Sequence, residues 1–273
     1  MNTAQPTYVL GHTDRELDRL TTQARMFEPF TRQLLQQAGI CSGMRVLDVG
    51  CGSGDVAFLA ADLVGPTGRV VGVDRASAAV TRASKRAQAA GAGNVYFRQG
   101  DPAEMEVTDR FDAVIGRLVM MYCPDPVDTL RKLAQHLRPG GVIAVQEIDM
   151  ESFRSQPPSP LYQQCFEWIN QTFRATRTRL RMGLELHSTF VEAGLPAPSL
   201  RLDATVGAGP GSPLYSAVAE AVRTLLPAME KFKIATAEQV RIDDLEQRLR
   251  NEIGSDGVAT FPCLIGAWAR TAA

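Results

Sequence analysis

Val46-Leu47-Asp48-Val49-Gly50-Cys51-Gly52-Ser53-Gly54 is the stretch that decides the fold of this 273-residue chain. Residues 45–49 have the apolar pattern of a short buried strand, and a helix is expected over 55–63. The glycines between them permit positive φ angles and let a ligand approach the backbone closely. The free N–H groups at the start of the helix favour a polar or anionic group. Several nucleotide-binding folds use this unit, so by itself it does not name the ligand.

Short apolar strands and helices alternate beyond this stretch. Strands separated by single helices need crossover connections, which predict a parallel sheet with helices on both faces. The predicted fold class is α/β, with a doubly wound, seven-stranded, mostly parallel sheet. The expected strands are 45–49, 69–73, 94–98, 111–115, 142–146, 199–206 and 258–269. The expected helices of the sheet region are 55–63, 76–90 and 126–137.

The chain is expected to form one domain over 1–273, with three parts. Residues 1–43 form an N-terminal helical cap with two helical stretches, of which the first begins after the capping-box spacing of Thr13 and Glu16 and the second ends at Gly39. Residues 44–150 form the core, and 151–273 form a substrate and lid half with the last strands. In that half, helices are expected over 161–173, 183–193, 214–232 and 237–253.

Composition excludes several classes of partner. The 29 Lys and Arg against 30 Asp and Glu give a net charge of −1, without the basic excess of a non-specific nucleic-acid binder. No apolar run is long enough for a membrane span, and the N-terminus lacks a signal-peptide pattern. The five cysteines are scattered without a Cys-x-x-Cys pair, which argues against a zinc site and a disulfide framework. We therefore expect a soluble, reduced, cytoplasmic protein, either a monomer or a homodimer.

Two acids follow the second and third strands. Asp74 ends the second strand, where a carboxylate can hold both ribose hydroxyls of a nucleoside. Asp101 follows the third strand in Gly100-Asp101-Pro102, where a carboxylate can accept a hydrogen bond from an adenine amino group. In a doubly wound sheet, both acids and the glycine turn lie at the carboxyl edge of the strands, where ligands bind. Together they predict a nucleoside site.

Over residues 44–149 the sequence resembles the class I (Rossmann-like) S-adenosylmethionine (SAM)-dependent methyltransferases. It is similar to their small-molecule branch, which includes methyltransferases of type 11 and those of ubiquinone and menaquinone biosynthesis. The stretches that carry the resemblance are 46–54, Val71-Gly72-Val73-Asp74, Gly100-Asp101, Phe111-Asp112-Ala113-Val114-Ile115 and Leu137-Arg138-Pro139-Gly140-Gly141.

The resemblance implies that SAM is the cofactor and S-adenosylhomocysteine the product. Gly50 and Gly52 would pass close to the methionine part, and Asp48 would orient it through the turn or a water. The backbone carbonyl of Arg117, after the fourth strand, would meet the methionine amino group. Tyr8 lies in a segment resembling one that closes over SAM. The full cofactor-binding set is Tyr8, Asp48, Gly50, Cys51, Gly52, Asp74, Arg75, Gly100, Asp101, Pro102 and Arg117.

Two other interpretations of the glycine turn are a purely structural connection and a dinucleotide site. A dinucleotide fingerprint has the form Gly-x-Gly-x-x-Gly. Here Asp55 occupies the position of the last glycine, and Asp48 inside the strand suits a ligand with an amino group better than a pyrophosphate. Both features favour SAM over NAD.

Candidates for an acid–base role are His187, Tyr122 and His12, and none is decisive. Tyr122 could instead be a packed aromatic at the pocket rim, and His12 could have a local structural role beside the capping box. His187 lies in the variable half, where it could face the substrate. His136 is expected to be solvated at the end of its helix. A metal is not expected, because metal-dependent catechol-type relatives place an acid just after the fourth strand, where this chain has Gly116 and Arg117.

The predicted function is metal-independent methyl transfer from SAM to a small, largely apolar molecule, a metabolite or natural product. The helical segments at about 157–193 and 211–255 are expected to build the acceptor pocket and its lid. The alternative is a SAM-binding protein that transfers no methyl group and acts as a scaffold or a non-transfer catalyst. Accumulation of S-adenosylhomocysteine in the presence of an acceptor separates the two. The identity of the acceptor and the atom that is methylated, oxygen, nitrogen or carbon, stay open.

Overall fold

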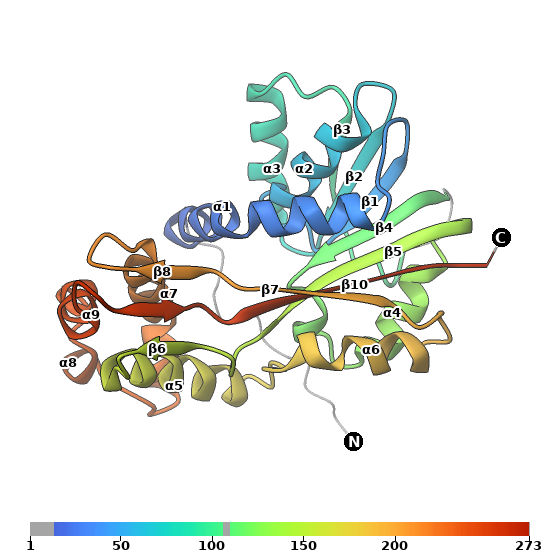
Figure 1. The fold of residues 1–273 in the computed structure, drawn as a ribbon. Helices are drawn as coiled ribbons and strands as arrows, with labels where there is room; N and C mark the ends of the chain where they lie inside the picture. The colour runs from blue at the N-terminus through green and yellow to red at the C-terminus, as the bar shows by residue number, and fades with distance from the viewer. Residues whose placement is uncertain (1–13, 106–109, 273) are drawn as a thin grey trace.

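A computed structural model describes residues 14–105 and 110–272. Its main sheet has seven strands in the order β3-β2-β1-β4-β5-β10-β7 (Figure 1). Neighbours from β3 to β5 are parallel, and β10 is antiparallel to both β5 and β7. This confirms the predicted fold class. The strands are β1 (Arg45–Val49), β2 (Arg69–Asp74), β3 (Val95–Gln99), β4 (Phe111–Arg117), β5 (Leu137–Asp149), β7 (Ser199–Asp203) and β10 (Cys263–Arg270).

Helices cover both faces of this sheet because both faces of its strands are apolar. Val46 and Leu47 are adjacent in β1, point to opposite faces and are both fully buried. Val46 packs with apolar residues of α2, whereas Leu47 belongs to the core that includes α4 and α6. The helices of the first face are α1 (Asp14–Gln37), α2 (Asp55–Val64) and α3 (Ser77–Ala89); those of the second are α4 (Pro126–Ala134) and α6 (Met182–Glu192).

The direction in which successive strands are added to the sheet reverses between β1 and β4. The chain winds outward from β1 to β2 and β3, then returns to the other side of β1 as β4 and continues to β5. At such a switch point the loops after two neighbouring strands separate and leave a crevice at the carboxyl edge. The glycine turn after β1 and residues 118–122 after β4 border this crevice.

The N-terminal cap is one helix rather than the two expected stretches. α1 runs through Pro29 without a break. Along one side of it, Phe27, Thr31 and Leu34 are buried at helical spacing. Packing of that continuous face against the rest of the fold stabilises the helix beyond its local propensity.

A second, three-stranded sheet extends beyond the carboxyl end of β5 and was not expected. Its order is β6-β9-β8, with antiparallel pairs, and with four helices it forms the cap at one end of the molecule (Figure 1). Its strands are β6 (Arg154–Gln156), β8 (Val206–Ala208) and β9 (Val258–Thr260). The helices of this cap are α5 (Pro160–Ala175), α7 (Pro213–Lys231), α8 (Ala237–Val240) and α9 (Leu245–Ile253).

Several expected elements are divided or shortened in the structure. The strand expected over 258–269 is split by Pro262, which has no N–H to donate, into β9 and β10. The strand expected over 199–206 is likewise shared between β7 and β8, in different sheets. The helix expected over 237–253 breaks at Arg241, whose φ of 51° is left-handed. Helix α4 ends at Ala134, because Leu137 already pairs with Phe111 in the sheet. No helix in the described part of the chain combines the length and apolar character needed to cross a membrane.

The contact between α1 and β10 yields a test of this packing. A Cβ placed on Gly266 would lie 2.6 Å from Leu34 Cδ1, and Leu34 is itself buried. We expect Gly266→Val to push α1 away from β10 and to lower the free energy of unfolding by about 1–3 kcal/mol. Urea denaturation followed by circular dichroism measures the change.

The matched control is Gly93→Val. A Cβ on this exposed glycine meets nothing within 4 Å, so the free energy of unfolding should change by no more than about 0.5 kcal/mol. Equal stability of the two variants would contradict the close approach of α1 to β10.

Candidate active site

One cavity of about 740 Å³ lies at the carboxyl edge of the sheet, beneath α1, α5 and α7. Its polar half is lined by the glycine turn and the segments after β2 and β3. Its other half is mainly apolar and is closed by residues from the helical cap. The apolar lining includes Phe27, Leu118, Met121, Ile148, Met150, Phe166, Ile169, Phe173, Leu225 and Phe261.

The glycine turn has a backbone shape that side chains would obstruct. Gly50 and Gly52 have φ values of 61° and 52°. A Cβ on Gly50 would lie 2.6 Å from Val119 Cγ2, so glycine is needed for the turn to pass the loop after β4. A Cβ on Gly52 would meet no protein atom within 4 Å, although Gly52 lines the cavity. Cys51, between them, also lines the cavity.

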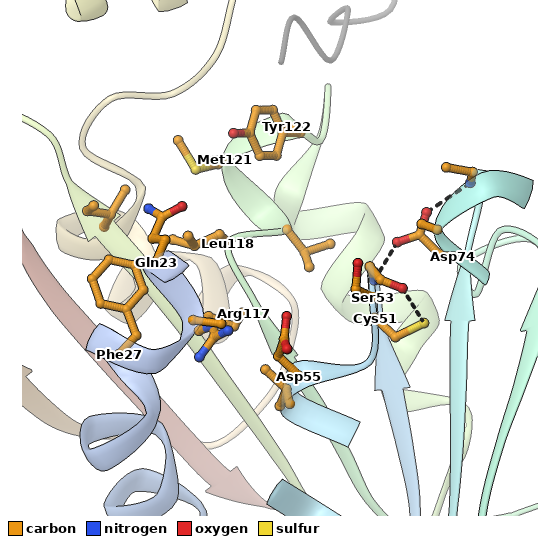
Figure 2. A pocket seen from close by; sticks show the side chains of 18 of the residues that line it. Gln23, Phe27, Cys51, Ser53, Asp55, Asp74, Arg117, Leu118, Met121 and Tyr122 are labelled. Carbon is orange, nitrogen blue, oxygen red and sulfur yellow. Dashed lines mark hydrogen bonds between the residues drawn. The ribbon is translucent and has the colours of Figure 1, made fainter. Parts of the chain in front are cut away.

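Asp74 holds this turn in place. Its Oδ2 accepts a hydrogen bond from the Gly52 N–H at 2.8 Å, and its Oδ1 accepts one from the Ala76 N–H at 2.8 Å (Figure 2). The Asp74 carboxylate therefore ties the end of β2 to the turn after β1 while lining the cavity.

The loop after β3 is hydrogen-bonded to the end of β2. The Gly100 N–H donates to the Asp74 carbonyl at 2.9 Å. Asp101 accepts from the Ala103 N–H at 3.0 Å through Oδ1 and pairs with Arg75 through Oδ2. Arg75 and Asp101 line the cavity together with Pro102, whereas Gly100 does not.

Two buried polar atoms near the turn have no hydrogen-bond partner among the described residues: Asp48 Oδ2 and Ser53 Oγ. Asp48 is 1% exposed and lies behind the turn, and burial raises the pKa of its carboxyl well above the usual value. The positive charge of Arg117 opposes that rise. Buried polar groups in folded proteins are almost always hydrogen-bonded, so these atoms indicate a place where a polar ligand or a water completes the structure.

Arg117 ends β4 and points toward α1. Its Nη1 donates to Thr31 Oγ1 at 3.0 Å, and its guanidinium carbon lies 5.9 Å from the centre of the Phe27 ring. Thr31 in turn donates to Gln146 Oε1 at 2.7 Å. Burial lowers the pKa of Arg117, and the nearby carboxylates of Asp55, Asp48 and Glu28 counteract this.

Comparison with known proteins identifies the family. Residues 40–194, more than half of the chain, match the family described as "Methyltransferase domain". The chain belongs to this methyltransferase family. Nocamycin O-methyltransferase of Saccharothrix syringae is 34% identical over 204 residues, which are 74% of this chain and 65% of that protein. 2-Phytyl-1,4-naphtoquinone methyltransferase of Synechococcus elongatus is 40% identical over 124 residues, 45% of this chain and 51% of that protein. The chain thus spans about half to two thirds of the length of these relatives.

A solved structure shares the fold. Phosphoethanolamine N-methyltransferase 2 of Haemonchus contortus, in complex with S-adenosyl-L-methionine, superposes with a TM-score of 0.59 at 17% sequence identity. The alignment covers 96% of this chain and 58% of that protein. At this identity the similarity shows the fold alone.

Glu147 is the main residue of this candidate site that the sequence analysis missed. It is fully buried, and its carboxylate accepts hydrogen bonds from the N–H groups of Val119 at 2.8 Å, Met120 at 2.7 Å and Met121 at 3.3 Å. These N–H groups open the short 3-10 helix Met120–Tyr122, which follows Leu118 at a left-handed φ of 56°. A charged residue within the apolar run 142–148 was the available signal.

Glu147 therefore positions a wall of the cavity without entering it. Met121 and Tyr122, the last residues of the 3-10 helix, both line the cavity (Figure 2). Burial raises the pKa of Glu147 to about 7, although the three backbone N–H donors lower it.

The acid–base candidates from the sequence lie in different places relative to the cavity. Tyr122 lines the cavity. His187 is exposed on α6 and is not among the cavity-lining residues. Tyr8 and His12 lie outside the described residues. In the described ranges, no group of His, Cys, Asp and Glu side chains has an arrangement suited to a metal ion.

The expectation of a solvated His136 is wrong. Its side chain is 2% exposed, and its Nε2 makes a 2.8 Å hydrogen bond with the carbonyl oxygen of Pro102. The reason is that α4 ends before His136, whose own carbonyl accepts from the Phe111 N–H at the start of β4. His136 therefore supports the loop after β3 from beneath.

The raised pKa of Glu147 predicts a pH-dependent stability. The pKa in the folded protein is about 7 and the ordinary value is 4.5, so the folded state holds the proton more tightly between these values. The proton's stabilising contribution is greatest below the lower value and is lost as pH rises through 7. We expect the unfolding free energy of the wild type, relative to that of Glu147→Gln, to rise by about 2–3 kcal/mol as the pH falls from about 8 to about 5.

Urea denaturation of both proteins at several pH values measures this difference, and it cancels the contribution of Asp48, which both proteins retain. A difference that stays constant over the range would show that Glu147 titrates alike in the folded and unfolded states.

Proposed function

We propose that the protein transfers a methyl group from SAM to a small, largely apolar acceptor, a metabolite or natural product, without a metal ion. The main observation in support is that a single cavity has a polar half, bordered by Asp74 and Asp101, and a mainly apolar half beneath the helical cap. Leu118, Val119, Met121 and Tyr122, from the segment after β4, also line this cavity. Relatives named for nocamycin and for a phytylated naphthoquinone support an acceptor of this kind.

The residues of the polar half fit the cofactor. The Asp74 oxygens keep further lone pairs for the hydroxyls of a ribose while they accept from the turn. Asp101 can accept from an adenine amino group. The open space over Gly52 leaves room for the ligand to touch the backbone. The unpartnered Ser53 Oγ, on a residue that lines the cavity, suits a polar methionine end, and Asp48 lies behind the turn. SAM, when bound, supplies a methyl group already activated by the sulfonium charge.

The chain's own contribution is then to position the acceptor and to exclude water. Apolar side chains from α1, α5 and α7 enclose the acceptor half, including Phe27, Phe166 and Phe173. Holding acceptor and methyl group in line can supply about 7–11 kcal/mol of the barrier reduction. A base is needed only where the acceptor must lose a proton, and Tyr122 is our candidate for a hydrogen-bonding role there.

We assign the acceptor pocket to α5 and α7 within the segments 157–193 and 211–255. Cavity-lining residues come from these two helices, whereas α6, α8 and α9 supply none among the described residues. A cytoplasmic location, with a monomer or a homodimer as the assembly, completes the proposal.

Calorimetric titration of the cofactor-stripped protein tests the cofactor first. We expect S-adenosylhomocysteine to bind at micromolar concentration and NAD⁺ not to bind. The protein is then incubated with SAM and a panel of neutral polycyclic and quinone-derived phenols, with and without EDTA. Release of S-adenosylhomocysteine that depends on an acceptor and is unaffected by EDTA supports transfer. Binding without turnover on any acceptor would favour the non-transfer alternative, and no binding would overturn the cofactor assignment.

The Asp74→Ala variant tests the polar half. We expect binding of S-adenosylhomocysteine to weaken by about 100-fold or more, because hydrogen bonds to a charged group contribute about 1.5–3 kcal/mol each. The Gly52 and Ala76 N–H groups also lose their acceptor, so the free energy of unfolding should fall by about 1–3 kcal/mol while the protein stays folded. Titration calorimetry and circular dichroism provide the two readouts.

Asp62→Ala on α2 is the control. Its side chain is 66% exposed, and removing it should change the affinity by less than about two-fold. An unchanged affinity in Asp74→Ala would remove Asp74 from the site.

A further inference from the structure

Arg117 is a partly buried cation that has no ion-pair partner among the described residues. No described carboxylate lies within ion-pair distance of its guanidinium, and within the described residues its one hydrogen bond is that from Nη1 to Thr31. A guanidinium carries several N–H donors in a rigid fork. Burying such a cation is costly unless an anion pairs with it. The unused donors therefore point to a ligand that carries a negative charge.

The position of Arg117 identifies which part of the site this is. Arg117 lines the large cavity, and Figure 2 shows its side chain between Phe27 of α1 and Asp55 at the start of α2. Among the described cavity-lining residues, the other cation is Arg75, which is already paired with Asp101 at the nucleoside end. Arg117 is thus the cation available at the opposite end of the polar half.

Carboxylates also lie at this end. Asp48 lies behind the glycine turn with one oxygen unpartnered, and Asp55 lines the cavity while pairing with Arg86 at 2.8 Å. The Asp55 carboxylate in the cavity lining, together with an incompletely used guanidinium, makes this end complementary to a zwitterion. An α-amino acid group, with an ammonium and a carboxylate on one carbon, has this charge pattern. Resting on the proposed function, the matching part of the ligand is the methionine end of the cofactor.

We propose that the Arg117 side chain binds the carboxylate of the cofactor's amino-acid end and so selects cofactors that carry it. The role differs from that of a backbone carbonyl at the same residue, which contacts the ammonium and would survive substitution of the side chain. Thr31 orients the guanidinium by accepting from Nη1, and Gln146 accepts from Thr31. Thr31 is therefore a positioning residue on α1.

A binding cycle isolates the proposed contact. Its ligands are S-adenosylhomocysteine and decarboxylated S-adenosylhomocysteine, which differ only in the carboxylate. Its proteins are the wild type and Arg117→Gln, and titration calorimetry measures all the affinities. We expect Arg117→Gln to lower the affinity for S-adenosylhomocysteine by about 10- to 100-fold, as for loss of a hydrogen-bonded charge. The affinity for the decarboxylated ligand should fall by less than about three-fold, because this ligand has no carboxylate to make the contact.

Arg25→Gln is the matched control for a change of charge. Arg25 is exposed and lies with Arg117 beside a smaller depression between α1 and α2, outside the large cavity. Its substitution should alter both affinities by less than about two-fold because solvent screens its charge. If Arg117→Gln fails to fold, Arg117→Lys keeps the charge without the fork, and its loss should again be confined to the ligand with the carboxylate.

The outcomes separate this inference from the proposed function. Failure of S-adenosylhomocysteine to bind the wild type would overturn both. Tight binding to the wild type with an equal loss for both ligands in Arg117→Gln, or with no loss for either, would overturn the role of Arg117 alone. An equal effect of Arg25→Gln would show a general electrostatic attraction in place of a direct contact.

Discussion

The carboxylate of Asp74 is the constraint on which the polar half of the cavity depends. By accepting from Gly52 and Ala76, it joins the turn after β1 to the start of α3. The backbone carbonyl of the same residue accepts from Gly100 and so attaches the loop after β3. One residue at the end of β2 therefore sets the distance between three loops of the crevice. A ligand that also uses this carboxylate would meet a group whose orientation is already determined.

The polar half could be predicted from the sequence because it is local. The turn at 50–54 follows β1, Asp74 is the last residue of β2, and Asp101 lies two residues after β3. Once the alternation of strands and helices predicts a parallel sheet, these positions must meet at its carboxyl edge. The glycines add a backbone signal that is independent of any partner, since the approach of Val119 to Gly50 requires a residue without a Cβ.

The apolar half could not be predicted in the same way, because its lining comes from distant parts of the chain. Phe27, Phe166 and Phe261 lie on α1, on α5 and just before β10, yet they form one aromatic cluster. The ring centroid of Phe261 lies 5.9 Å from that of Phe27 and 5.9 Å from that of Phe166. Residues of this kind look like ordinary core residues in a sequence. The small sheet escaped notice because strands of three residues show no alternation. Glu147 escaped because its partners are backbone N–H groups, which carry no sequence signal.

Helix α1 connects the two halves of the site physically. Its Phe27 lies in the apolar wall, and one turn later its Thr31 bonds to Arg117 at the polar end. Because 27 and 31 share a face of one rigid helix, a shift of α1 that moves one side chain must also move the other. The Thr31 hydroxyl reaches Gln146 of β5, whose neighbour Glu147 holds the 3-10 helix that carries Met121 and Tyr122. The order of β4 and β5 in the sheet thus brings the supports of both halves together behind the cavity, so the geometry of the acceptor wall depends on the same strand ends as the polar site.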